Sequence, residues 1–100
     1  MVRHIVMWKF KANAEGAARS ENLTRAKALL ESLREKIPEI RYLQVGIDLC
    51  RTEASYDLVL TSEFADTEAL RAYQRHPDHL RVVEFLRKVH EGRVVVDHII

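Results

Sequence analysis

The segment at residues 3–10 constrains the fold more than any other, because it alternates like a strand and is apolar on both faces. One face carries His4, Val6, Trp8 and Phe10. The other face carries Arg3, Ile5, Met7 and Lys9. Alternation with a period of two predicts a β-strand, and apolar residues at the centre of both faces predict that neither face is left in water. We therefore expect a sheet that is covered on both sides.

The remaining segments predict helices and strands in a definite order. An apolar stripe at spacings of three and four residues, from Leu23 to Ile37, predicts a helix at 18–37 that Pro38 brings to an end. Two shorter helices are expected at 67–75 and 77–90, and further strands at 40–50, 56–64 and 93–100. Polar connections are expected at 13–16 and 51–55.

Local signals also indicate where the helices begin and which side of them is buried. Ser20 and Asp66 are candidate N-caps, and Pro77 suits the first position of the last helix. The expected buried side of that helix consists of Leu80, Val83, Leu86 and Val89, with Val82 and Phe85 beside them. Each helix is therefore expected to pack on the sheet by one apolar side.

The resulting order, β-α-β-β-α-β, predicts an α+β fold of the ferredoxin-like kind. Such a fold has a four-stranded antiparallel sheet with helices on one face, and its second and third strands pair as a hairpin. The uncovered face is expected to carry Ile5, Met7, Val45, Val59 and Val94, or their alternates. A monomer rarely leaves so large an apolar patch in water, so we expect the sheet of a second copy to cover it in a homodimer.

Composition limits the class of protein without indicating its chemistry. The chain has 100 residues, a mass of 11.6 kDa and a formal net charge of +1, which predicts one domain over residues 1–100 and no nucleic-acid partner. Cys50 is the single cysteine, which rules out an internal disulfide and favours a reducing, cytoplasmic location. No apolar run approaches the roughly 18 residues of a membrane helix, and the charged start does not resemble a signal peptide.

Candidate functional residues cluster at 73–79, in the segment Tyr-Gln-Arg-His-Pro-Asp-His. Pro77 places His79 in the first turn of a helix, whose positive end disfavours a charged imidazole and leaves it able to accept a proton. Tyr73 lies one short helix away and can offer a phenol donor. Asp97 on the last strand can hold the tautomer of His79 if the fold brings the two together. The segment therefore predicts a proton-accepting site at His79.

Each of these residues also has a purely structural interpretation. His79 can be a helix-start histidine bonded to a buried aspartate, His76 a cap or surface residue, and Trp8 part of the core. The proline between His76 and His79 does not give the i, i+4 spacing of helical zinc ligands, so no metal site is expected. Cys50 has no activating histidine near it in sequence, and an inert thiol is expected.

The chain resembles the Dabb family of stress-responsive dimeric A/B barrel domains over nearly its whole length. The matching segments are His4–Phe10, Ile37–Pro38, Gly46–Asp48, Tyr56–Leu60, Phe64, Tyr73–His79 and Val95–Asp97. The His-Pro-x-His segment and the opening His-x-x-x-x-Lys-Phe segment are the most specific of these. The resemblance implies a homodimer of ferredoxin-like subunits whose sheets face each other in a barrel.

The resemblance also implies a candidate activity, because a plant member of the family is a polyketide cyclase that needs no metal or cofactor. Its catalytic histidine, assisting tyrosine and supporting aspartate match His79, Tyr73 and Asp97, and its first-strand pocket histidine matches His4. On this resemblance His79 takes a proton next to a carbonyl, Tyr73 hydrogen-bonds the developing oxyanion, and Asp97 orients His79. Neither a metal nor a cofactor is expected.

The implied pocket lies between the sheet and the helices and is repacked in this chain. Its expected wall includes His4, Val6, Trp8, Leu30, Leu60 and Arg93. Trp8 and Arg93 replace smaller apolar residues of the cyclase, while Ala26 and Leu30 replace its bulky aromatic residues. An alkyl-chain polyketide does not suit such a pocket, whereas Arg93 suits a carboxylate or phosphate group.

Three functions remain open on the sequence. The leading hypothesis is a protein that binds a small aromatic or acidic molecule near His79. The second is a cofactor-free cyclase, lyase or isomerase with His79 as general base. The third is a non-catalytic, stress-associated oligomer whose cavity is closed by Trp8. A cofactor-free monooxygenase is suggested only by analogy of fold.

Overall fold

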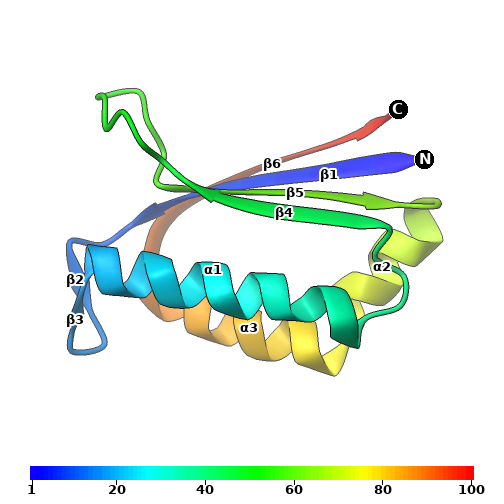
Figure 1. Cartoon of the computed structure of the whole chain (residues 1–100), viewed down its shortest axis with the longest axis horizontal. Coiled ribbons are helices and arrows are strands. Elements are labelled where there is room, and N and C mark those ends of the chain that lie inside the picture. The colour runs from blue at the N-terminus through cyan, green and yellow to red at the C-terminus, as the bar shows by residue number, and fades with distance from the viewer.

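Strand β1 (Val2–Phe10) lies inside a four-stranded antiparallel sheet. The structure is a computed structural model that describes residues 1–100, and Figure 1 shows the sheet above a layer of helices. The strand order is β4-β5-β1-β6, with β4 at Tyr42–Ile47, β5 at Leu58–Phe64 and β6 at His90–Ile99. Strands β4 and β5 form the expected hairpin. The ferredoxin-like α+β fold is therefore confirmed.

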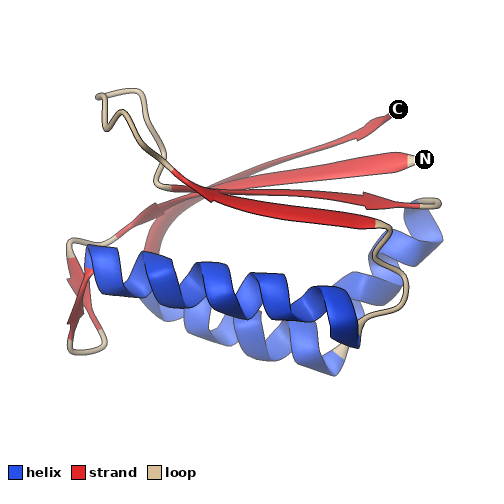
Figure 2. Ribbon diagram, in the orientation of Figure 1, coloured by secondary structure: helices blue, strands red, loops and turns tan.

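Three helices cover one face of this sheet (Figure 2). They are α1 (Arg19–Lys36), α2 (Thr67–Arg75) and α3 (Pro77–Val89). The connection expected at 13–16 is a small hairpin of β2 (Asn13–Ala14) and β3 (Ala17–Ala18). Its turn residues, Glu15 and Gly16, have φ angles of 51° and 73°, the left-handed geometry that a two-residue hairpin turn of type I′ requires. No helix combines the length and apolar character needed to span a membrane.

The predicted helix starts hold for α2 and α3 but not for α1. Asp66 caps α2 by accepting a hydrogen bond from an amide of its first turn, and Pro77 begins α3. The prediction of Ser20 as an N-cap is wrong, because α1 begins at Arg19 and its N-cap position is Ala18, two residues before Ser20. The Ala18 side chain cannot accept a hydrogen bond. The β2–β3 hairpin determines this entry, since the Arg19 amide donates to a carbonyl in the connection after β1.

The core lies between the sheet and the helices, and the stripe predicted for α1 is buried in it. These stripe residues are Leu23, Ala26, Leu30, Leu33 and Ile37. Two other predicted positions are wrong. Val45 lies on the covered face of the sheet rather than the open one, because it pairs with buried Leu60 of β5. Leu80 is 53% exposed, because it lies about 200° around α3 from buried Val82, at about 100° per residue.

The second face of the sheet carries no helix (Figure 2) and is apolar at its centre. We define the open-face patch as Ile5, Met7, Val59, Val94 and Val96, which lie opposite or beside one another on β1, β5 and β6. In addition, β6 pairs only with β1, so its outer edge is free. A long apolar strand with a free edge, next to an uncovered apolar face, is a surface that folded proteins cover.

Candidate functional site

A small pocket of about 100 Å³ lies between the sheet and the helices and unites most of the predicted site residues. Its wall contains His4, Val6, Trp8, Leu30, Leu60 and Arg93, together with Tyr73 and His79. The wall also contains Val83 and Leu86 of α3, which the sequence marked as apolar helix residues but not as pocket residues. Asp97 is the predicted site residue that does not line the pocket.

His79 lies in the first turn of α3 and is held by the helix before it. Its Nδ1 lies 3.0 Å from the carbonyl oxygen of Gln74. Because a carbonyl can only accept, Nδ1 carries the hydrogen and Nε2 of the neutral ring is left as an acceptor. Burial lowers the pKa of His79, the bond to Gln74 opposes this shift, and the charges of His4, Arg93 and His76 lower it further. His79 is therefore a neutral imidazole with its Nε2 available at neutral pH.

Asp97 does not orient His79, contrary to the prediction. Instead its Oδ1 lies 2.5 Å from Nδ1 of His4. The physical reason is strand register: His4 and Asp97 are directly opposite each other in the β1–β6 ladder, where side chains on one face meet. His79 needs no carboxylate, because the Gln74 carbonyl already accepts its Nδ1 hydrogen.

Tyr73 lies at the centre of the site and has an unsatisfied hydroxyl group. Its side chain is fully buried, and its hydroxyl oxygen has no hydrogen-bond partner. The ring centroid lies 4.4 Å from that of His79, 4.9 Å from that of Phe64 and 6.2 Å from that of His4. Burial raises the pKa of Tyr73 far above its usual value, although the charge of Arg93 acts in the opposite direction. Tyr73 is therefore a neutral phenol that can donate a hydrogen bond to a bound molecule.

Replacing Tyr73 with Phe is expected to stabilise the unliganded protein by about 1 kcal/mol, because a buried donor without a partner costs free energy. The free energy of unfolding, measured by urea denaturation, checks this. Tyr42→Phe is the matched control, since the hydroxyl of Tyr42 is exposed and donates to Gln44 on the surface. We expect that control to change the stability by less than about 0.5 kcal/mol. A destabilised Tyr73→Phe variant would contradict the unsatisfied state of the hydroxyl.

Arg93 supplies the positive charge of the pocket wall. It lies on β6 directly opposite Trp8 of β1, on the face that carries the helices. Its charge acts on both Tyr73 and His79, yet its guanidinium forms no ion pair with any carboxylate of the chain. A guanidinium without a partner, beside an unsatisfied phenol, can bind a carboxylate or another planar anion.

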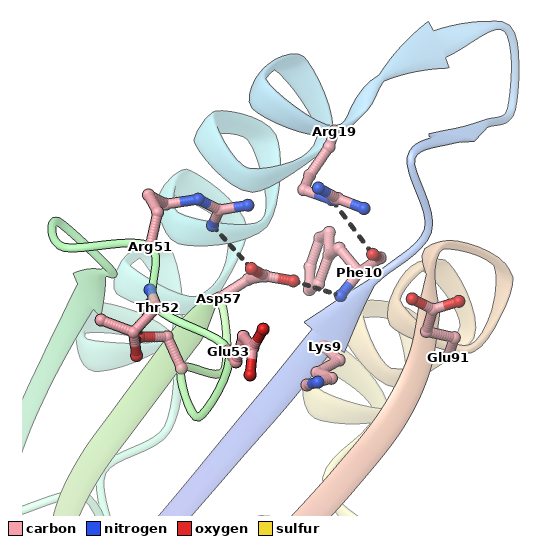
Figure 3. A pocket seen from close by; sticks show the side chains of 9 residues that line it. Lys9, Phe10, Arg19, Arg51, Thr52, Glu53, Asp57 and Glu91 are labelled. Atoms are coloured by element: carbon pink, nitrogen blue, oxygen red, sulfur yellow. Dashed lines mark hydrogen bonds and ion pairs between the residues drawn. The ribbon is translucent and has the colours of Figure 1, made fainter.

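A second, larger hollow of about 280 Å³ lies at the other end of β1 (Figure 3). Asp57 is at its centre, where one carboxylate oxygen accepts from the Phe10 amide at 2.7 Å and the other from Arg51 at 2.6 Å. Arg19 donates from Nε to the Phe10 carbonyl at 3.1 Å. These bonds tie the β4–β5 loop and the start of α1 to the end of β1. The charged groups of this hollow thus have a structural role, and we place the candidate site in the smaller pocket.

The remaining histidines lie outside the pocket. Nδ1 of His76 accepts from the Asp78 amide and so caps α3, in line with its expected cap role. His98 is exposed on β6. No three side chains of His, Cys, Asp or Glu lie close enough together to hold a metal ion.

Comparison with known proteins gives one family and several similar structures. The family described as Stress responsive A/B Barrel Domain (Dabb) matches residues 2–100. An uncharacterized protein of Streptomyces coelicolor is 29% identical over 91 residues, which cover 88% of this chain and 89% of that protein.

The similar solved structures include proteins described as dimeric. A dimeric protein of unknown function and ferredoxin-like fold from Bacteroides fragilis is 29% identical, with a TM-score of 0.83 over 97% of this chain and 93% of that chain. A hydroxynitrile lyase from Passiflora edulis is 24% identical, with a TM-score of 0.79 over 99% of this chain and 92% of that chain. The likeness to the hydroxynitrile lyase shows a shared fold.

Proposed function

The chain belongs to the Dabb family of stress responsive A/B barrel domains, and from this premise we propose that it is a homodimer that binds a small carboxylate in the pocket beside His79. The open-face patch supports the dimer, since a second sheet would cover it. The Bacteroides fragilis protein, which is described as dimeric, has the same fold. We also propose that residues 1–100 form one domain, because they share a single hydrophobic core. We propose a cytoplasmic location because the single cysteine cannot form an internal disulfide.

The observation that carries the ligand class is that the exposed Arg93 and the unsatisfied hydroxyl of Tyr73 share one pocket wall. The guanidinium of Arg93 has no carboxylate partner, and the hydroxyl of buried Tyr73 has no hydrogen-bond partner. A carboxylate would accept from both groups at once. The rest of the wall is mainly apolar, so the body of the ligand is expected to be apolar as well.

The size of the pocket favours an aliphatic acid over an aromatic one. Its volume of about 100 Å³ is below that of a cavity of roughly 150 Å³ that holds benzene in another protein. The indole of Trp8 forms part of the wall and limits this volume. A short, branched carboxylate therefore fits the pocket better than a benzoate.

Isobutyrate is expected to bind at least tenfold more tightly than its neutral analogue isobutyramide, and Arg93→Gln is expected to remove most of this difference. A hydrogen bond to a charged group contributes about 1.5–3 kcal/mol, which corresponds to roughly 10- to 100-fold in affinity. Titration of ¹⁵N-labelled protein by NMR measures both ligands. The matched control is Arg87→Gln, which removes an exposed arginine that pairs with Glu84 on α3.

Each outcome of this titration bears on the proposal. Equal binding of the acid and the amide would show that the pocket does not select a carboxylate. An unchanged preference in Arg93→Gln would assign the selection to another group. Absence of binding by both ligands would favour the non-catalytic oligomer, in which Trp8 keeps the cavity closed.

A cofactor-free lyase, cyclase or isomerase is the second candidate function, and one observation favours it. The Gln74 carbonyl fixes Nδ1 of His79 as the donor, which leaves Nε2 as a proton acceptor in the pocket. Tyr73 lies in contact with this ring and can donate to a developing oxyanion. Loss of turnover in His79→Gln, with the fold retained, tests this role.

A further inference from the structure

We propose that His4, held by Asp97, is a second proton-transfer group of the pocket, and that it works with His79 to enolise a small 2-oxo carboxylic acid. The inference rests on the proposed function, because Arg93 would bind the carboxylate of this substrate. It assigns His4 as the acid that contacts the carbonyl oxygen and Asp97 as a positioning residue that acts through His4.

The contacts of His4 determine its tautomer. His4 is a buried residue of β1, and its Nδ1 lies 2.5 Å from Oδ1 of Asp97. An ionised carboxylate can only accept, so Nδ1 carries a hydrogen and Nε2 is the ring nitrogen left for the pocket. The side chain of Asp97 is 41% exposed, whereas that of His4 is 3% exposed.

The two imidazoles of the pocket are held in different ways. His79 bonds to a neutral backbone carbonyl, whereas His4 bonds to a carboxylate. The groups that face this pair are Asp97 and Arg93 from β6, Tyr73 from α2 and His76 from the junction between α2 and α3. Among these only Asp97 is negative, and it lies against His4. In the proposed step the imidazole held by the carboxylate acts as the acid and the imidazole held by the carbonyl acts as the base.

Three polar atoms of one small pocket lack a partner within the chain. They are Nε2 of His4, Nε2 of His79 and the hydroxyl oxygen of Tyr73. Strands β1 and β6 already pair along their length, so the His4–Asp97 pair is not needed to join them. A purely structural pair would also not require these three atoms to meet in one pocket. Of the three, the Tyr73 hydroxyl is a buried polar atom without a partner, which calls for an explanation. A ligand that bonded to it in this pocket would also meet the two ring nitrogens.

The proposed step moves two protons and breaks one C–H bond. Nε2 of His79 takes a proton from the carbon next to the carbonyl of the 2-oxo acid. The electrons of that C–H bond form a carbon–carbon double bond, and the carbonyl π electrons move to oxygen. The oxygen takes its proton from Nε2 of the His4 imidazolium, with Tyr73 as hydrogen-bond donor. Reversal returns the oxo acid, which carries a solvent hydrogen on carbon after His79 has exchanged with water.

Pyruvate in D₂O is the probe for this step, and deuterium uptake into its methyl group is followed by ¹H NMR. We expect the protein to accelerate uptake above the buffer rate, and His4→Gln and His79→Gln each to slow it by 10²-fold or more. Asp97→Asn is expected to slow deuterium uptake at least tenfold and to shift the pH profile of the uptake rate, because His4 would lose the carboxylate that bonds to its Nδ1. Glu84→Gln, which removes an exposed carboxylate from α3, is the control and should leave the rate unchanged.

Long-range ¹H–¹⁵N spectra of the histidine rings test the geometry without a ligand. We expect an Nδ1–H signal for His4 in the wild type, and its loss or exchange broadening in Asp97→Asn while the backbone spectrum stays folded. A neutral His4 with its hydrogen on Nε2 in the wild type would overturn the inference. An increase in uptake that was the same in wild type, His4→Gln and Asp97→Asn would also overturn it.

The binding measurement separates this inference from the proposed function. If pyruvate binds through Arg93 but no uptake exceeds the buffer rate, the second proton-transfer group is disproved and the carboxylate site stands. If neither pyruvate nor isobutyrate perturbs the pocket residues, the carboxylate site itself is disproved. Uptake that depends on His4, Asp97 and His79 supports both.

Discussion

Replacing Val94 with Asp is expected to convert the protein from a dimer to a monomer. Val94 is the open-face patch residue of edge strand β6 that lies opposite Met7, and it is 46% exposed in a single subunit. In a dimer of facing sheets each subunit would bury one unpaired carboxylate, so the interface would contain two of them. Burying an uncompensated charge costs several kcal/mol, and we expect the dimer dissociation constant to rise by at least about 10³-fold.

Sedimentation equilibrium measures this dissociation constant, and circular dichroism shows whether the separated subunits stay folded. Leu80→Asp is the matched control, because Leu80 has a similar exposure but lies on the outer side of the helix layer. A dimer of unchanged affinity in Val94→Asp would place the interface elsewhere. Dissociation of Leu80→Asp alone would place it on the helices.

The second large effect is expected for Trp8→Ala, which should destabilise the fold by about 3–5 kcal/mol. Trp8 is almost fully buried, belongs to the core and also forms part of the pocket wall. Its removal takes away apolar contacts and leaves a cavity that the neighbouring side chains cannot fill completely. Urea denaturation followed by circular dichroism measures the loss, since Trp8 is the single tryptophan and its fluorescence disappears with it.

The same variant tests the size limit of the pocket. We expect benzoate to bind Trp8→Ala and to raise its free energy of unfolding by mass action, while wild type does not respond. Leu49→Ala is the control for stability, because Leu49 is 89% exposed and should lose less than about 0.5 kcal/mol. A loss below about 1 kcal/mol in Trp8→Ala would contradict its place in the core. Benzoate binding to wild type would contradict the size argument.

Much of the fold could be predicted because its determinants are local. The alternation in β1 and the stripe from Leu23 to Ile37 report which side of each element is buried, since side-chain direction follows backbone periodicity. Predictions that used one residue alone were less secure. Ser20 has a suitable side chain for an N-cap, but the preceding hairpin starts α1 at Arg19, so Ser20 lies inside the helix. Leu80 is apolar, but the phase of α3 turns it outward.

The residues of the candidate site could be predicted better than the hydrogen bonds between them. Tyr73 and His79 lie six positions apart around a proline break, so two short helices bring their rings together. The resemblance to the Dabb family added His4 as a pocket residue and indicated Arg93 by its departure from the family, whereas Asp97 was already predicted as the partner of His79. The partner of Asp97 was predicted wrongly, because a carboxylate on a strand can reach whichever histidine the register brings opposite it.

The amino-acid sequence by itself determined the element order, the helix-facing sides of most elements and the local pairing of Tyr73 with His79. These features depend on periodicity and on chain breaks at Pro38 and Pro77, which act over a few residues. Only the tertiary structure decided that Asp97 bonds to His4, that Val45 faces the helices, and that Arg93 and the Tyr73 hydroxyl are left without partners. The reason is that strand register joins residues as far apart as His4 and Asp97, and such pairing depends on the packing of the whole sheet.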